Sequence, residues 1–151
     1  TLTVEMAKFA KHVTGVDINP DILAMARQRT DRLGLQNVSF LVDDASNLSL
    51  SSESLDVVFF SQSLHHLENP QKGLHEAARI LRPGGLVLVM ELASHQEDWV
   101  LEKLGHKWLG FEKEFFIDCM ENAGLKNLFS EALPHRREEL FQIILSAGCK
   151  S

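Results

Sequence analysis

The stretch "HVTGVDINP", residues 12–20, decides the fold class, because it joins a short apolar run to a helix start through one acidic residue. Asn19 and Pro20 are a typical N-cap and first helical residue, so they predict a helix that begins at Pro20. Gly34 is the expected end of that helix. A strand that ends near Asp17 and a helix that follows it form one βα unit, which is the building block of a parallel sheet.

The same alternation continues along the chain. After an amphipathic opening piece, residues 2–11, and the first βα unit, apolar runs predict three more strands, at "VSFLV" (38–42), "LDVVFF" (55–60) and "LVLVME" (86–91). Asn69-Pro70 predicts another helix start, and Pro83-Gly84-Gly85 is expected to break that helix before the next strand.

Beyond Glu91 the pattern changes. Two helices are expected at about 96–109 and 112–123, followed by strands near 125–133 and 139–147 that "PHRRE" joins into a hairpin. The sequence therefore predicts an α/β, Rossmann-like, mostly parallel sheet with helices on both faces and a C-terminal antiparallel hairpin.

Composition narrows the class of protein. A chain of 151 residues with 44% hydrophobic and 24% charged residues, and with no linker or internal repeat, predicts one domain over residues 1–151. The formal net charge of −6 argues against nucleic acid as a binding partner. The adjacent residues Arg136 and Arg137 are expected to lie in a solvated turn. Without an apolar run of about 20 residues or a signal-peptide pattern, we expect no membrane partner and a cytoplasmic location.

Polar residues follow the predicted strands at the edge where open parallel sheets bind ligands. They are Asp17, Asp44, Ser61 and Glu91. An acid after the second strand of a nucleotide-binding fold can accept hydrogen bonds from both ribose hydroxyls. Alternatively, Asp17 caps the next helix or is solvated.

The segments "VTGVDINPDILAMAR" (13–27), "VSFLVDDASNL" (38–48), "LDVVFFSQSLHHL" (55–67) and "ARILRPGGLVLVME" (78–91) resemble, in order and spacing, class I S-adenosylmethionine-dependent methyltransferases of the ubiquinone/menaquinone-biosynthesis type. The resemblance covers residues 1 to about 92. It implies S-adenosyl-L-methionine as cofactor, with Asp17 on the ribose, Ile18 on the adenine, Asp44 and the Ala45 amide at the adenine edge, and Ser61 at the methionine end.

The segment "ELASHQEDWVLEKLGHKWLGF", residues 91–111, resembles the methyltransferases associated with arsenic-repressor-like regulators. An arsenic substrate would require several thiolates, and the chain offers only Cys119 and Cys149, so we expect another small-molecule methyl acceptor, held under residues 95–111. The identity of the acceptor and the oligomeric state are left open.

The sequence departs from the family at its start. Family members begin with an apolar strand and a glycine-rich loop patterned roughly like "LDLGCGTG", and residue 1 lies just beyond the expected end of that loop. We therefore expect an N-terminally incomplete methyltransferase domain that lacks the first strand. Buried backbone groups that this strand would have paired would each cost about 1 to 3 kcal/mol if left unsatisfied.

Three histidines are candidate catalytic residues. His65 and His66 follow the predicted strand 55–60 and could include a general base, or they are ordinary loop histidines. His95 lies four residues after Glu91, and it either contacts substrate or caps a helix that begins near Gln96. No metal site is expected, because the sequence contains no clustered ligand motif.

The expected function is methyl transfer from S-adenosylmethionine to a small molecule. One alternative is a non-catalytic, truncated partner subunit of methyltransferase fold, which the absent glycine-rich loop favours. A less favoured alternative is an NAD-dependent oxidoreductase, because an acid after the second strand also binds the ribose of NAD. The chain has no tyrosine to serve as a catalytic residue of the common dehydrogenases.

Overall fold

The computed structural model describes residues 2–135 and 138–151, so the predicted turn at Arg136-Arg137 lies outside the described residues. The chain divides into two compact units, Thr1–Ser49 and Leu50–Ser151, and each is described by itself. One domain over the whole chain therefore stays a prediction. Among the described residues, no helix is long and apolar enough to span a membrane.

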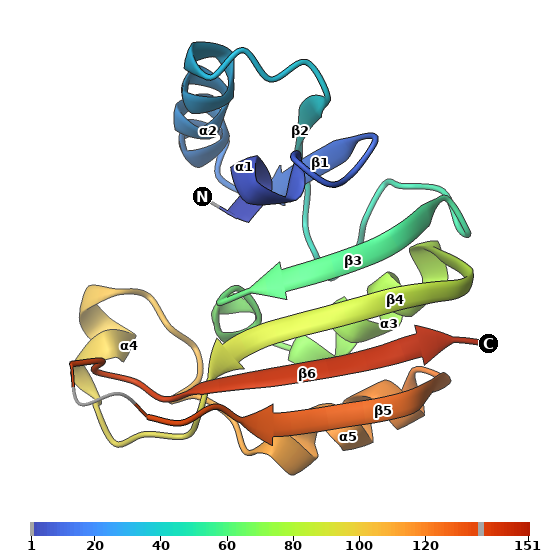
Figure 1. Cartoon of the computed structure of the whole chain (residues 1–151). Helices are drawn as coiled ribbons and strands as arrows, with labels where there is room; N and C mark the ends of the chain where they lie inside the picture. The colour runs from blue at the N-terminus through green and yellow to red at the C-terminus, as the bar shows by residue number, and fades with distance from the viewer. Residues whose placement is uncertain (1, 136–137) are drawn as a thin grey trace. The chain divides into compact units, whose positions relative to one another are not determined.

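The first unit is a two-stranded parallel sheet with two helices (Figure 1). Its elements are α1 (Leu2–Met6), β1 (Val13–Asp17), α2 (Pro20–Arg32) and β2 (Val38–Val42). The strands pair in register from Val13 opposite Val38 to Asp17 opposite Val42. The βα unit predicted from "HVTGVDINP" is thus confirmed: β1 ends at Asp17, and α2 begins at Pro20.

Local signals explain where α2 begins and ends. The Asn19 side chain accepts a hydrogen bond from the Asp21 N–H at 2.9 Å, and Pro20 occupies the first helical position. Gly34 has a φ of +68°, a conformation that glycine adopts without strain, just after the helix ends at Arg32. The predicted opening piece, residues 2–11, forms only the short helix α1.

The second unit is a mixed sheet with the strand order β3-β4-β6-β5 (Figure 1). Its strands are β3 (Leu55–Ser61), β4 (Leu81–Leu92), β5 (Leu125–Ala132) and β6 (Ile143–Lys150), and its helices are the 3-10 turn η1 (Leu64–His66), α3 (Pro70–Ile80), α4 (Trp99–Lys103) and α5 (Lys113–Asn122). Only β3 and β4 run parallel, whereas β4–β6 and β5–β6 are antiparallel.

The α/β Rossmann-like class and the C-terminal hairpin of β5 and β6 are confirmed. The described strands form two sheets rather than one, and half of their pairings are antiparallel, so "mostly parallel" is too strong. The added antiparallel character comes entirely from β6, which inserts between β4 and β5. The position of a hairpin in a sheet depends on contacts distant in sequence, which periodicity does not reveal.

The helix that Asn69 caps ends at Ile80, earlier than predicted, and strand β4 already includes "LRPGG". Proline disfavours the helical conformation of the residue before it, and the chain is extended from Leu81 onward. Leu55 pairs with Leu81 and Val57 with Leu86, so the extra residues form a bulge at the start of β4. The predicted break at Pro83-Gly84-Gly85 is therefore misplaced: the helix ends before these residues, which lie in the irregular start of β4.

The core of the second unit lies between the sheet and the two helices α3 and α5. Its fully buried side chains include Leu74 and Ala77 of α3, Val87 and Val89 of β4, and Phe116 and Met120 of α5. In Figure 1, α3 and α5 lie on the same face of this sheet. Burial of a side chain such as Phe116 contributes about 1.5 to 3 kcal/mol, so this face anchors the strands that end at the histidine cluster described below.

Candidate functional site

Asp17 and Ile18 lie at the carboxyl end of β1. The Asp17 side chain is half-buried, and its Oδ1 accepts a hydrogen bond from the Asn19 N–H at 2.8 Å. Asp17 is therefore not the cap of α2, which is Asn19; its contact is a local turn before the helix and occupies only one of the two carboxylate oxygens. The Ile18 side chain is 70% exposed, which presents an apolar surface directly beside that carboxylate.

The adjacent acids Asp43 and Asp44 have different surroundings. Asp43 Oδ2 accepts hydrogen bonds from the N–H and hydroxyl of Ser49, both at 2.7 Å, and these bonds lower the pKa of Asp43 below its ordinary value. Asp44 Oδ1 accepts from the N–H and hydroxyl of Ser46, at 2.8 and 2.7 Å. Asp43 therefore holds the loop closed over six residues, whereas Asp44 makes only a local turn beside the half-buried Ala45.

Parallel pairing brings the two candidate acids to one edge of the first unit's sheet. Asp17 pairs with Val42, and the Asp43 N–H donates to the Asp17 carbonyl at 3.1 Å, so both strands end at the same level. Asp17, Ile18, Asp44 and Ala45 thus follow the carboxyl ends of neighbouring strands, as the sequence predicted for them.

Ser61, the last residue of β3, belongs to the second unit. It pairs with Met90 of β4 and is half-buried. The next residue, Gln62, adopts a φ of +49°, and its N–H donates to the Met90 carbonyl at 2.7 Å. The chain therefore turns sharply after Ser61 and leads directly into the 3-10 turn η1, which carries His65 and His66.

A buried carboxylate anchors η1 to β4. Glu91 is completely buried; its Oε1 accepts the Leu64 N–H at 2.7 Å, and its Oε2 lies 2.7 Å from His65 Nδ1 and 3.2 Å from the Leu92 N. A carboxylate only accepts hydrogen bonds, so His65 Nδ1 is the donor and its Nε2 carries the lone pair. His65 itself is only 3% exposed.

His66 and His106 lie against His65. The ring centroids are 4.3 Å apart for His65 and His66 and 4.1 Å apart for His65 and His106. The Lys107 N–H donates to the His65 carbonyl at 2.8 Å, which holds the segment after α4 beside η1. His106, 40 positions beyond His66, was missed by the sequence reasoning because no local spacing links it to the other two.

His95 does not cap a helix, because α4 begins only at Trp99. Its Nδ1 accepts a hydrogen bond from the Glu97 N–H at 3.2 Å, and its Nε2 is buried with no partner among the described residues. The N–H of His95 donates to the Leu109 carbonyl at 2.9 Å. The predicted helix 96–109 is reduced to the short α4, because the chain returns at Leu109 to pair with His95.

Burial lowers the pKa of both His95 and His106 from the ordinary histidine value. The nearby carboxylate of Glu97 partly offsets this effect on the pKa of His95, whereas the neighbouring histidines lower the pKa of His106 further. Both imidazoles consequently stay neutral down to a lower pH than an exposed histidine does.

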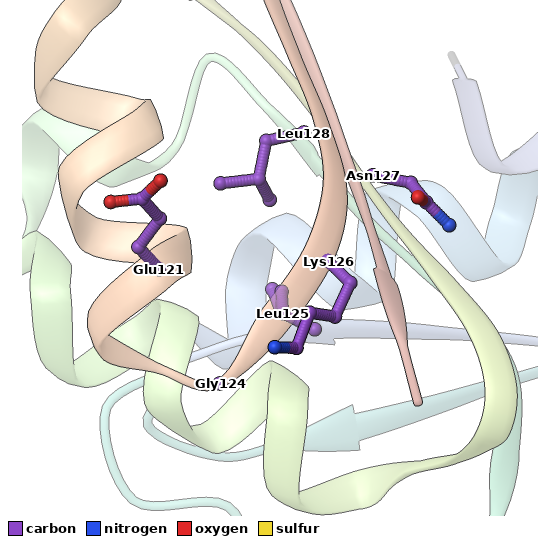
Figure 2. Close-up of a pocket in the computed structure, with 6 residues that line it drawn as sticks. All are labelled: Glu121, Gly124, Leu125, Lys126, Asn127 and Leu128. Carbon is purple, nitrogen blue, oxygen red and sulfur yellow. The ribbon is translucent and has the colours of Figure 1, made fainter.

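A hollow lies away from the histidines, at the other end of β5. It measures about 460 Å³ at the turn between α5 and β5 and is lined by Glu121, Gly124, Leu125, Lys126, Asn127 and Leu128. In Figure 2, Leu128 and Asn127 point to opposite sides of β5. None of the residues predicted to bind cofactor or acceptor lines it.

Comparisons with known proteins identify the family. A family model described as methyltransferase domain matches residues 1–89. The ubiquinone/menaquinone biosynthesis C-methyltransferase UbiE of Brucella canis is 34% identical over 106 residues, which are 70% of this chain and 39% of the relative. The chain thus spans about two fifths of the length of that relative.

Two solved structures share the fold. The YcgJ protein from Bacillus subtilis has a TM-score of 0.80 at 15% identity, covering 97% of this chain and 86% of the other. Phosphoethanolamine N-methyltransferase 2 of Haemonchus contortus, solved with phosphomonomethylethanolamine and S-adenosylhomocysteine, has a TM-score of 0.79 at 17% identity, covering 95% and 45%. Since the family model matches well over half of its residues, the chain belongs to the methyltransferase domain family, as the resemblance predicted.

Proposed function

We propose that this chain binds S-adenosylmethionine through its first unit and transfers the methyl group to a small-molecule acceptor. The observation that carries the proposal is the placement of Asp17 and Asp44 after two paired parallel strands, inside the segment that matches the family model. This edge is where open parallel sheets bind nucleotides. The family match gives no support to the oxidoreductase alternative.

The donors and acceptors at this edge suit the cofactor. Ribose hydroxyls and the adenine amino group donate hydrogen bonds, and the carboxylates of Asp17 and Asp44 accept them. The exposed Ile18 side chain offers an apolar surface to the adenine ring, and the Ala45 amide offers a donor to its edge. When bound, the cofactor supplies a methyl group that its sulfonium already activates.

The protein's main contribution would be alignment of the acceptor. Good orientation lowers a barrier by about 7 to 11 kcal/mol, whereas a general base typically adds 10² to 10⁴-fold, about 3 to 5 kcal/mol. His65 is the best-placed proton acceptor, since Glu91 fixes its Nδ1–H and leaves Nε2 as the base. His66 and His95 complete the group that we propose contacts the acceptor, together with residues 95–111.

Calorimetric titration of S-adenosylhomocysteine into the full chain tests the proposal. Asp17→Asn keeps the shape of the side chain and removes the charge, so it should weaken binding by about tenfold to a hundredfold, the value of charged hydrogen bonds. Asp31→Asn, an exposed acid of α2, is the matched control and should bind like the parent chain. Circular dichroism confirms that each variant is folded.

Two results would count against the proposal. One is equal affinity of the parent chain and Asp17→Asn. The other is no saturable binding by a folded parent chain, which would favour a non-catalytic partner subunit of methyltransferase fold.

A further inference from the structure

Three imidazoles of the second unit converge from two segments far apart in sequence. Each of His65, His66 and His106 offers one ring nitrogen, and these three atoms all lie within 4.8 Å of one another. His65 and His66 come from η1, and His106 follows Gly105, whose φ of +67° turns the chain after α4. The convergence is therefore a product of the fold rather than of a sequence motif.

Hydrogen bonds to backbone carbonyls hold the two segments together. The Lys107 N–H donates to the His65 carbonyl at 2.8 Å, and the Trp108 Nε1–H donates to the Leu67 carbonyl at 2.9 Å. These bonds lie immediately beside the histidines on both segments. The two chain segments are thus positioned before any ligand arrives, which reduces the ordering cost of binding.

The hydrogen bonds also determine which ring nitrogens are lone-pair donors. His65 Nδ1 donates to Glu91, and His66 Nδ1 donates to the Gly105 carbonyl at 3.3 Å, because a carbonyl only accepts. In the neutral ring, each Nε2 then has a free lone pair. The Glu91–His65 contact is the carboxylate–histidine arrangement that orients metal ligands and increases their basicity.

The surroundings of His106 give a second, independent indication that a ligand binds here. The residue is only 9% exposed, and its Nδ1 is buried without a hydrogen-bond partner among the described residues. A buried polar atom without a partner costs about 1 to 3 kcal/mol, so such atoms usually have an unseen partner such as a water or an ion. The two neighbouring imidazoles make a cation the suitable partner.

We propose that His65, His66 and His106 bind one divalent transition-metal ion of the Zn²⁺ type, with Glu91 orienting His65. Imidazole nitrogens favour Zn²⁺, Ni²⁺ or Cu²⁺ over Mg²⁺ and Ca²⁺, which prefer oxygen ligands. Tetrahedral Zn²⁺ holds its nitrogen ligands about 3.4 Å apart, since Zn–N bonds are about 2.0 to 2.1 Å. The exposed His66 side chain can close the remaining difference by rotating.

Three protein ligands leave a fourth tetrahedral position for water or a small anionic ligand. With the ion bound, Nε2 of His65 is a ligand rather than the free base considered above. The inference does not rest on the proposed function, because metal binding is measured without cofactor or acceptor.

Titration of Co²⁺ into the full chain, purified without a histidine tag, tests the site. Tetrahedral Co²⁺ gives visible ligand-field absorption, and we expect bands that saturate at one ion per chain and that Zn²⁺ abolishes by displacement. His66→Ala and His106→Ala should each weaken Co²⁺ binding at least about tenfold, by analogy with losses in metal sites. His75→Ala, an exposed histidine of α3 outside the cluster, is the matched control.

The outcomes are distinct even if one variant fails to fold. Because the His66 side chain is exposed, His66→Ala tests the site if His106→Ala unfolds the chain. Absence of saturable absorption in the folded parent chain would overturn the proposal. Equal Co²⁺ affinity of His66→Ala and His75→Ala would also overturn it.

Discussion

The completely buried carboxylate of Glu91 lies 2.7 Å from Nδ1 of His65 and joins the end of β4 to the turn after β3. The same carboxylate accepts the Leu64 and Leu92 N–H groups, so three donors surround it. A buried charge with these partners is stabilising only as long as the set stays complete. The pair therefore links the stability of the second unit to the chemistry of its histidines.

Glu91→Gln should destabilise the second unit by about 1 to 3 kcal/mol, because an amide nitrogen would face one of the three donors. Both tryptophans, Trp99 and Trp108, lie in this unit, so their fluorescence during urea unfolding measures its stability. Glu121→Gln replaces an exposed acid and should stay within about 0.5 kcal/mol of the parent chain. Equal unfolding midpoints for the two variants would contradict the role given to Glu91.

The stability of the second unit should fall as the pH decreases from 7.5 to 5.5. Burial lowers the pKa of His95 and His106 in the folded chain, so the unfolded chain binds more protons near and below its histidine pKa of about 6.5. Stability from these groups is consequently complete above that pH and lost below it. Urea midpoints followed by tryptophan fluorescence measure the change.

The matched variant for this pH dependence is His106→Gln, which removes one of the two imidazoles whose pKa burial lowers. Its urea midpoint should vary less between pH 7.5 and 5.5 than that of the parent chain. A parent midpoint that rises toward pH 5.5 would refute the assignment of neutral, buried imidazoles.

The two cysteines should differ in their reaction with a thiol reagent at pH 8. Burial within α5 raises the pKa of Cys119 to about 11, so its thiol is almost entirely protonated. Cys149 on β6 is only half-buried and should react first. Stopped-flow labelling of Cys149→Ser should lose the fast phase, whereas labelling of Cys119→Ser should retain it; the reverse pattern would show that Cys119 is accessible.

The features of the fold that could be predicted from the sequence are those that depend on residues close together in the chain. Strand 38–42 has the predicted bounds, and the helices that begin at Pro20 and Pro70 start where their asparagine caps indicated. Apolar runs, caps and prolines act over a few residues, so the sequence displays them directly. The cofactor candidates could be found in the same way, because each lies at or just after the end of a strand.

The cluster of His65, His66 and His106 could not be predicted, because it depends on contacts between residues far apart in the sequence. His106 meets His65 only because Lys107 pairs with the turn after β3, and this contact spans about forty positions. Likewise, Gly110 allows Phe111 to pair with Ala93, since a Cβ at Gly110 would lie 2.1 Å from the Ala93 carbonyl oxygen. That pairing shortens α4, and helical periodicity alone could not anticipate it.

The measurement that tests the central claim most directly is a titration of the isotope-labelled chain with S-adenosylhomocysteine, followed by the chemical shifts of its backbone amides. The account predicts saturable shifts concentrated at Asp17, Ile18, Asp44 and Ala45. Shifts confined to the hollow at residues 121–128, with none at those four amides, would contradict it.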